Sequence, residues 1–307
     1  MDAYKCLICF SAMQGPVYQV SEMMFGSGER FAYTQCPECG TIQQLSPPTN
    51  MGSYYPAAYY SFTGLSRSTV PVRWMKKIRL VLYRASGLSL FRPVYENWLH
   101  HLAARESDQI ADIGCGNGQL LYEMHASGYK HLSGFDPFLA EPLRVASGLE
   151  LFKLELHQIL GTFQVIMLHH AFEHMRDPDA SFAKLASLLQ PGGRLLIRVP
   201  VSDGEAWSIF REHWVQLDAP RHYFIPSVTG MERLARRYGL ELFRTEFDST
   251  SFQFWGSQRY RDGASLSDRN PSKIPSAEQM RDYEQRAKLL NQTQKGDQAA
   301  FYFRKPI

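Results

Sequence analysis

The feature that most constrains the fold is a run of three glycines between a strand pattern and a helix pattern. The segment ADIGCGNGQL covers residues 111–120. A short apolar run enters the turn Gly114, Gly116 and Gly118, and a helix pattern begins near Gln119. Glycine permits positive φ and lets a ligand approach the main chain, and the amide groups at a helix start favour a negatively charged group. The segment therefore predicts a ligand-binding turn inside an α/β fold.

From about residue 107, short β-branched runs alternate with helix patterns, which is typical of parallel βαβ units. We expect strands at 109–114, 131–136, 149–154, 164–169 and 194–200, with helices at 118–127, 138–147 and 178–190. The remaining chain predicts a helix at 227–238, a strand at 240–247, a helix at 277–291 and a strand at 298–305. No clear period is found over residues 202–225.

The chain divides into three parts by composition. Residues 1–48 carry two cysteine pairs and end in the proline break LSPPT. Residues 49–105 are rich in tyrosine and contain two amphipathic helix patterns, near 70–85 and 92–104. Residues 106–307 form the α/β part. We expect a small module, a linker with lid helices, and one large domain.

The spacing of the glycines separates two classes of ligand. A dinucleotide site has the pattern G-x-G-x-x-G, whereas this chain has G-x-G-x-G preceded by Asp112. A second acid, Asp136, lies in GFDPF, 18 residues after Gly118. A carboxylate there accepts hydrogen bonds from both hydroxyls of a ribose. Phe138 is then placed to lie against an adenine ring.

These motifs resemble those of class I S-adenosylmethionine (AdoMet)-dependent methyltransferases. The resemblance extends to LHHAFEHMRDP (168–178) and LLQPGGRLLIRVP (188–200), although Gln164 stands where that family often has an aspartate. It implies a Rossmann-like, seven-stranded, mostly parallel sheet with an antiparallel last strand. It also implies cofactor contacts by Asp112, Gly114, Cys115, Gly116, Gly118, Asp136, Pro137, Phe138 and His170. The alternative is a nucleotide-binding Rossmann domain of another kind, in which Asp112 only caps a turn.

Two C-x-x-C pairs, separated by 26 residues, lie near the N-terminus: Cys6 with Cys9, and Cys36 with Cys39. Two such turns can present four thiolates to one zinc ion, and a site closed by four sulfurs is structural. Unrelated thiols or a redox pair are the alternative. A zinc ribbon, the tyrosine-rich YYPAAYYSF (54–62) and a methyltransferase domain together resemble bacterial sugar and polysaccharide methyltransferases. Some of these, the sugar C-methyltransferases, have a C-terminal domain longer than the corresponding part of this chain.

Methyl transfer to a hydroxyl or carbon needs a proton acceptor, and histidine titrates in the useful range. His222 lies in PRHYF after the fifth expected strand, where the sugar C-methyltransferases carry a histidine-rich motif. We expect His222 to be the general base and His174 to shape the same cleft. A pocket-lining role without proton transfer is the alternative for His169, His170 and His174. Four tyrosines of the 54–62 segment (Tyr54, Tyr55, Tyr59 and Tyr60) are candidates for a lid.

The net charge of +3 is small, and RWMKKIR (73–79) is the one dense basic cluster. Its expected role is the solvated face of a helix, so nucleic acid is disfavoured and a small-molecule or glycan acceptor is expected. An RNA methyltransferase and a non-catalytic binding protein remain alternatives. No apolar run is long enough to span a bilayer, and the first residues are too polar for a signal peptide, which predicts a cytoplasmic location. No pattern predicts an oligomeric state.

Overall fold

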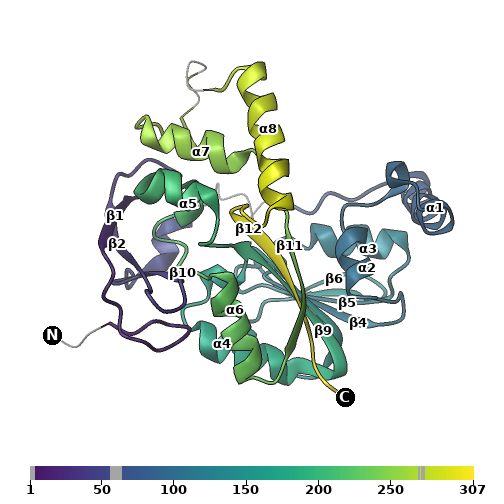
Figure 1. Ribbon diagram of the computed structural model, residues 1–307. Coiled ribbons are helices and arrows are strands. Elements are labelled where there is room, and N and C mark those ends of the chain that lie inside the picture. Colours follow the sequence, from purple (N-terminus) through teal and green to yellow (C-terminus); the bar gives the residue numbers. More distant parts are fainter. Residues whose placement is uncertain (1–3, 56–63, 269, 271–273) are drawn as a thin grey trace.

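The structure is a computed structural model that describes residues 4–55, 64–268, 270 and 274–307. Two β-sheets lie side by side, a large one and a small one, with helices around them (Figure 1). The large sheet has the strand order β11-β12-β9-β8-β4-β5-β7-β6, and the small sheet has the order β1-β2-β3-β10.

The large sheet is mostly parallel. Its parallel strands are β4 (Gln109–Ile113), β5 (His131–Phe135), β7 (Leu149–Phe152), β8 (Phe163–His169) and β9 (Leu189–Pro200). The last strand, β12 (Gln298–Arg304), lies antiparallel between β9 and β11 (Glu241–Phe247). This arrangement confirms the expected Rossmann-like fold with a reversed final strand.

One expected helix is wrong. Residues 138–147 were expected to be helical, but Leu143–Ala146 forms the edge strand β6, antiparallel to β7. Pro142 lacks an amide N–H and opposes a helix at this point. Gly148, at φ +80°, makes the tight turn between the two strands, and a Cβ there would lie 1.9 Å from the carbonyl oxygen of Lys130. The sheet consequently has eight strands rather than seven.

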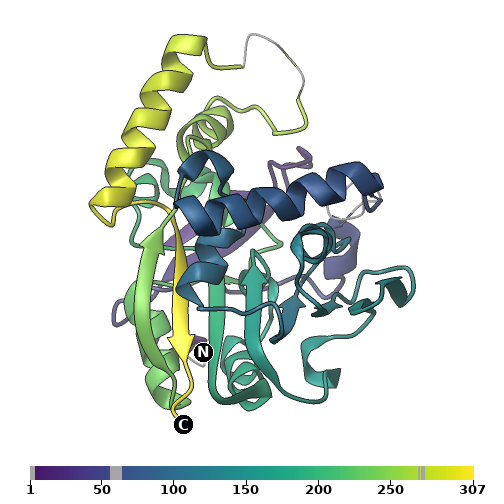
Figure 2. The ribbon, with the colours of Figure 1, turned by 90° about the vertical axis from the view of Figure 1, so that its right-hand side faces the viewer.

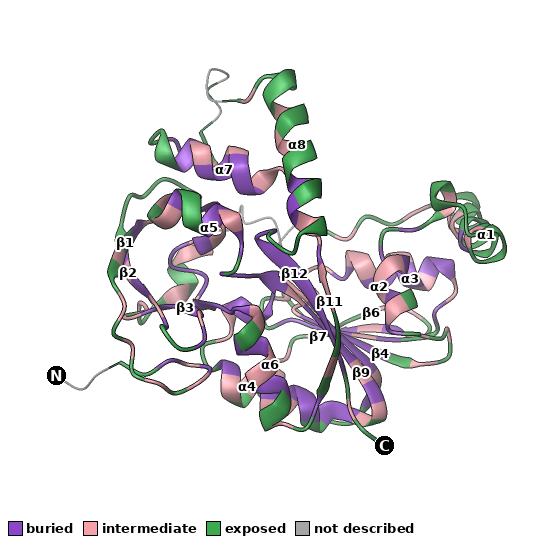
Figure 3. Ribbon diagram, in the orientation of Figure 1, coloured by how far each residue is buried: buried purple, intermediate pink, exposed green. Residues whose placement is uncertain are grey.

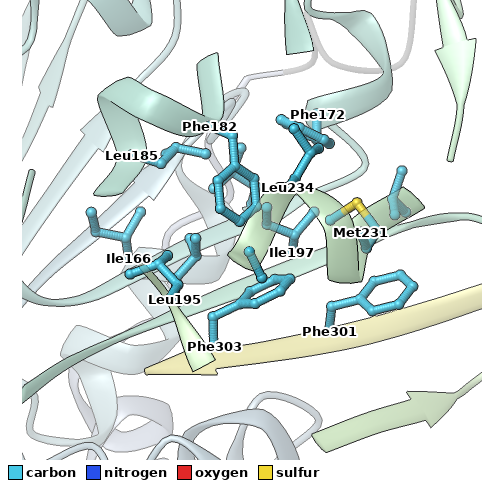
Figure 4. Packing of buried hydrophobic residues seen from close by; sticks show 14 of the residues in the cluster. Ile166, Phe172, Phe182, Leu185, Leu195, Ile197, Met231, Leu234, Phe301 and Phe303 are labelled. Carbon is cyan, nitrogen blue, oxygen red and sulfur yellow. The ribbon is translucent and has the colours of Figure 1, made fainter. Parts of the chain in front are cut away.

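The two faces of the large sheet bury different side chains, because residues alternate along each strand. Ile166, Leu195 and Ile197 point to the face covered by α4 (Pro178–Leu188) and α6 (Val228–Arg237) (Figure 4). Val165, Met167 and Leu196 point to the other face, which α2 (Glu96–His101) and α3 (Gln119–Ser127) cover. Both faces are apolar, as parallel sheets require.

The small sheet is built from two distant parts of the chain. Its strands β1 (Val17–Ser21), β2 (Arg30–Gln35) and β3 (Ile42–Gln44) come from the cysteine-bearing segment. The fourth, β10 (Phe224–Ile225), begins two residues after His222 and pairs with β3. The N-terminal segment is therefore joined to the rest of the protein through a shared sheet.

Further helices surround this sheet. Three helices pack against the small sheet and form a hydrophobic core with it: α5 (Glu205–Phe210), α7 (Phe252–Arg261) and α8 (Ala277–Gln292). A long helix, α1 (Val70–Ser86), lies over α3 on the opposite side of the molecule (Figure 1). No helix among the described residues is both long and apolar enough to cross a membrane.

Candidate active site and metal centre

The glycine turn lies at the carboxyl end of β4, and all three glycines have positive φ. The values are +76° at Gly114, +53° at Gly116 and +78° at Gly118, which caps the start of α3. A Cβ at Gly114 would lie 2.4 Å from the Cβ of Ala171, and one at Gly118 would lie 2.7 Å from the side chain of Leu151. Only glycine suits these positions, because an L-residue is strained there and has no space.

A cavity of about 650 Å³ opens beside this turn. It lies at the carboxyl ends of the strands, where open α/β sheets bind ligands, and its size suits a nucleoside-sized molecule. Of the residues expected from the sequence, its walls include Gly114, Asp136, Pro137, Phe138, His170 and His174. Tyr55 also lines the cavity, and its ring lies 5.2 Å from that of Phe138. Tyr59 and Tyr60 lie outside the described residues.

Two buried carboxyl groups lie at this edge of the sheet. Asp136, at the end of β5, accepts hydrogen bonds from the amide groups of Gly116 (2.9 Å) and Phe138 (2.8 Å). Burial nevertheless raises its pKa. Asp112 is 3% exposed, and its Oδ1 has no hydrogen-bond partner among the described residues. Burial and, secondarily, the charge of Asp136 raise the pKa of Asp112 to about 7. A buried oxygen without a partner is costly, and a cationic ligand group would relieve it.

His170 lies on the cavity wall with an unusual backbone φ of +52°. Arg198 donates a hydrogen bond to its Nε2 at 2.8 Å, and its Nδ1 lies 3.3 Å from a carboxylate oxygen of Glu173. Glu173 is fully buried, which opposes ionisation, but His170 and the histidines beside it hold its pKa below the usual range. Glu173 is thus a buried negative charge directly behind the cavity wall.

Two further histidines lie against Glu173. The rings of His174 and His222 are 4.6 Å apart, and His174 faces the cavity. The Nδ1 of His174 lies 3.0 Å from the carbonyl oxygen of Arg221, and the Nδ1 of His222 lies 2.7 Å from that of Gln216. A carbonyl only accepts, so each Nδ1 carries a hydrogen and donates to it.

These two histidines differ in their surroundings. Burial and the neighbouring His222 lower the pKa of His174 to about 4, so His174 is neutral at physiological pH. The Nε2 of His222 lies 4.0 Å from Glu173 and 3.9 Å from Asp218. A proton taken up there would lie between two carboxylates. Ligand atoms of Glu173, His174 and His222 also lie within 4.8 Å of one another.

The small sheet holds this histidine pair in place, which the sequence did not indicate. The hydroxyl of Tyr33, on β2, donates to the carbonyl oxygen of His222 at 2.9 Å. The buried side chain of Arg221 bonds to Asp218 at 2.6 Å and to Glu22 at 3.1 Å. An ion pair between residues 199 positions apart has no sequence signal other than the residue types themselves.

The four N-terminal cysteines come together, as the C-x-x-C spacing predicts. The Sγ atoms of Cys6 and Cys39 are 3.6 Å apart, those of Cys9 and Cys36 are 3.5 Å apart, and all four lie within 4.8 Å. Tetrahedral zinc with bonds of about 2.3 Å requires sulfurs about 3.8 Å apart. The hydrogen bond with Cys39, together with burial, raises the pKa of Cys6, so a cation is needed to hold all four as thiolates. The donor set and its spacing fit a structural zinc ion.

The sequence pattern of a family described as a methyltransferase domain matches residues 90–245, which is just over half of the chain. The chain belongs to this methyltransferase family. The matched range includes the glycine turn, both buried carboxyl groups and the histidine pair, whereas the four cysteines lie outside it.

Relatives of this methyltransferase have different acceptors in their names. Over 192 residues the chain is 28% identical to a tRNA U34 carboxymethyltransferase of Mannheimia succiniciproducens, and the match covers 57% of the chain and 58% of the relative. Over 178 residues it is 28% identical to a ubiquinone biosynthesis O-methyltransferase of Aromatoleum aromaticum, and the match covers 50% of the chain and 75% of that relative. The chain therefore spans little more than half the length of the first relative.

Among the solved structures that match this chain is a magnesium protoporphyrin IX methyltransferase from Synechocystis PCC 6803. It is 12% identical, covers 84% of this chain and 95% of its own, and superposes with a TM-score of 0.46.

Some of the expected cofactor residues of the methyltransferase line the cavity and others do not. Gly114, Asp136, Pro137, Phe138 and His170 line the cavity. The other four expected cofactor residues do not line it: Asp112, Cys115, Gly116 and Gly118. The expected base His222 does not line it either. Cys115 packs instead with the apolar residues around α3, and burial raises the pKa of its thiol.

Proposed function

We propose that this protein transfers a methyl group from AdoMet to a small-molecule, sugar or glycan acceptor. The cofactor occupies the cavity at the carboxyl ends of β4 and β5. Asp136 accepts the ribose hydroxyls, because each of its oxygens retains a lone pair beyond its bond to a backbone amide. Phe138 and Tyr55, whose rings already contact each other, provide an apolar surface on the cavity wall against which the adenine ring lies.

Asp112 binds the cationic ammonium group of the methionine part. Its buried Oδ1 lacks a protein partner, and an ammonium ion supplies both the hydrogen bond and the opposite charge. Gly114, where a side chain would collide with Ala171, lets the main chain approach the ligand. The bound cofactor supplies an electrophilic methyl group on a sulfonium ion.

The proposal rests on the histidine pair at the cavity, in which His174 lines the wall and His222 lies behind it. An acceptor hydroxyl or carbon must lose a proton as it is methylated. His174 is poorly suited to accept it, because its pKa is lowered to about 4. The Nε2 of His222 lies between Glu173 and Asp218, whose carboxylates would stabilise a proton taken up there. His222 is therefore the proposed general base, and His174 positions the acceptor.

Single-turnover transfer of a radiolabelled methyl group tests this assignment, with a panel of sugar nucleotides and small phenols as acceptors. His222→Ala is expected to reduce the rate by about a hundredfold or more while AdoMet affinity barely changes. His100→Ala, at an exposed position on α2, is the matched control. A His222→Ala protein with a near-normal rate would remove this residue from the mechanism.

Transfer to tRNA is the second candidate, since relatives named tRNA U34 carboxymethyltransferase match this chain. The same assay with total tRNA as acceptor separates the two. Labelled tRNA, with binding that weakens steeply as salt rises, would favour this candidate over a sugar. Lack of AdoMet binding would instead indicate a protein that keeps the fold without the activity.

The four cysteines are proposed to bind one structural zinc ion within a ribbon of residues 1–48. Four sulfur ligands leave no open position for a substrate. The metal centre supports the active site indirectly, because Cys39 and Gly40 accept hydrogen bonds through their carbonyl oxygens from Ser227 and Ser202. These serines follow β10 and β9, the strands that flank the histidine loop.

A further inference from the structure

Helix α1 is amphipathic, but its apolar side faces away from the protein. At about 100° per residue, six of its apolar residues fill one arc about 140° wide, while Val72 and Leu80 lie outside it. This arc is almost wholly exposed: Val70 (75%), Trp74 (69%), Met75 (67%), Ile78 (40%), Val81 (58%) and Leu82 (43%). Leu80 is the one buried residue of the helix. Figure 3 shows α1 exposed along its length at the side of the molecule.

Polar contacts hold the helix in this orientation. Lys76 pairs with Glu123 of α3 at 2.6 Å. Arg84 pairs with Glu106 at 2.8 Å and with the buried Glu96 at 3.2 Å. Arg79 donates to the carbonyl oxygens of Phe91 and Arg92. The polar side thus faces the protein, and the apolar arc is held outward, which is the reverse of an ordinary surface helix.

The segment that follows α1 extends the exposed apolar surface. Leu88, Leu90 and Val94 are 56%, 81% and 79% exposed, and Arg79 ties this segment to the helix. Exposed apolar side chains gathered in this way on one side of a protein indicate a binding face. In Figure 2, α1 lies in dark blue across the front of the molecule.

The charges on α1 indicate which class of partner its exposed face can bind. The helix contains five basic residues and no acidic one. Arg73 and Lys77 have no acidic partner among the described residues. Lys77 lies at the margin of the apolar arc beside Val70, and Arg73 lies about 40° further round the helix. A second copy of α1 would bring cations against cations, which opposes a symmetric dimer. The arc is mainly aliphatic, with one aromatic ring, whereas single-stranded RNA is bound on aromatic platforms.

We propose that α1 lies in the surface of an anionic lipid bilayer. An interfacial helix inserts an apolar face with tryptophan among the acyl chains and headgroups, while its basic side chains contact the anionic headgroups. Val70, Trp74 and Ile78 form the inserted face, and Arg73 and Lys77 bind the headgroups.

Docking in this way presents the cofactor edge of the protein to the membrane. Just before α1, the amide groups of Ser66 and Ser68 bond to Gln119 and Tyr122 of α3, at 2.9 Å in both cases. Because α3 begins at the glycine turn, the start of α1 is fixed beside the cofactor turn. The membrane-bound orientation does not depend on which acceptor is methylated.

Co-sedimentation of the full chain with vesicles tests the proposal. The wild type is expected to bind vesicles of phosphatidylglycerol and phosphatidylcholine, and to bind phosphatidylcholine alone weakly. Trp74→Ser with Ile78→Ser is expected to weaken binding by about tenfold or more, since each removes a large apolar contact. Arg73→Gln with Lys77→Gln should weaken binding to the anionic vesicles only. Leu160→Ser, at another exposed apolar position (84%), is the matched control.

Folding is monitored in parallel, because exposed substitutions should leave thermal unfolding almost unchanged. The fluorescence of Trp74, isolated by difference against Trp74→Phe, should shift to shorter wavelength with anionic vesicles. Three results would overturn the proposal. They are wild-type protein that ignores anionic vesicles, a dimer in solution that Ile78→Ser dissociates, and tRNA binding that is lost in the Trp74→Ser, Ile78→Ser variant while vesicle binding is kept.

Discussion

Asp112 and Asp136 are two buried carboxyl groups at one edge of the large sheet, and their environments assign them different roles. Asp136 already accepts two backbone amide bonds, whereas the Oδ1 of Asp112 has no partner among the described residues. Burial makes the charged form of Asp112 unfavourable until a cation arrives. Ligand binding should therefore be coupled to loss of a proton.

The affinity for AdoMet is expected to depend on pH through Asp112. Its pKa in the free protein is about 7, and the ammonium group of the ligand requires the ionised form. Affinity should be constant above pH 7 and fall below it, approaching about tenfold per pH unit. Asp112→Asn should bind weakly and without this pH dependence. Calorimetry between pH 5.5 and 8 measures both, and a wild type with equal affinity across that range would contradict the assignment.

The same group should influence stability. Its folded-state pKa lies above the unfolded value of 3.8, so the folded state retains the proton to higher pH. The free energy of unfolding of the ligand-free protein should consequently fall as pH rises from about 4 through 7. Asp112→Asn should be more stable than the wild type at pH 8. Denaturant unfolding of the two proteins at pH 5 and pH 8 gives the comparison.

At the scale of elements, the cysteine pairs link the ribbon to the fold. Cys6, Cys36 and Cys39 belong to the same apolar cluster as Met231 and Leu234 of α6. The carbonyl oxygen of Ile8 also accepts a hydrogen bond from Arg237 at the end of this helix. Metal loss should therefore disturb α6 as well as the ribbon.

Purified protein is expected to contain about one zinc ion per chain. Cys36→Ser should lose the ion and lower the thermal stability, because structural zinc contributes directly to folding. Cys115→Ser, which changes the one cysteine outside the cluster, should keep it. Elemental analysis and hydrogen exchange over 228–237 measure the two effects. Metal-free wild type, or a Cys36→Ser protein that retains zinc, would end the proposal.

The sequence predicted the elements that have a clear apolar periodicity. It missed elements whose formation depends on contacts with distant parts of the chain. Strands β4, β5 and β8 and helix α3 lie within about two residues of their expected positions, because their apolar pattern and the glycine turn are local signals. Helix α7 was not expected. Its polar Gln253 and Ser257 are buried, so its sequence has no clear apolar stripe.

For the site, the local motifs and the cysteine cluster were predictable, but the contacts that fix the histidine loop from distant segments were not. The acids at strand ends and the C-x-x-C spacing are motifs with fixed geometry. By contrast, the position of His222 depends on Tyr33 and Arg221, which bond across a sheet shared by the two ends of the chain. The basic cluster of α1 was expected to be a solvated helix face. Its Lys77 and Arg79 are exposed, but the apolar side of the helix is exposed too, which was not expected.

For the molecule as a whole, the ribbon sheet and the methyltransferase sheet meet at the histidine loop. Arg221 is fully buried between Asp218 of this loop and Glu22 of the ribbon. Breaking one partner of a buried ion pair leaves the remaining charge poorly compensated. The two halves should therefore unfold together rather than as independent domains.

Glu22→Gln is expected to lower the free energy of unfolding by about 1–3 kcal/mol, since Asp218 still pairs with Arg221. Methyl transfer should also slow, because the histidine loop loses an anchor. Glu29→Gln, in the same hairpin but exposed, should change stability by no more than about 0.5 kcal/mol. Equal stability of both variants and the wild type would show that the ribbon does not hold the loop.

Calorimetry with Asp136→Ala measures whether the edge formed by β4 and β5 binds AdoMet. The wild type should bind AdoMet with one site per chain. Asp136→Ala should lose about 1.5–3 kcal/mol of binding free energy, the range for a hydrogen bond to a charged group. Asp108→Ala, whose carboxylate only accepts a bond from the amide of Arg105 in an exposed turn, should bind as the wild type does. Wild-type protein that does not bind AdoMet, or an Asp136→Ala protein with undiminished affinity, would contradict the account.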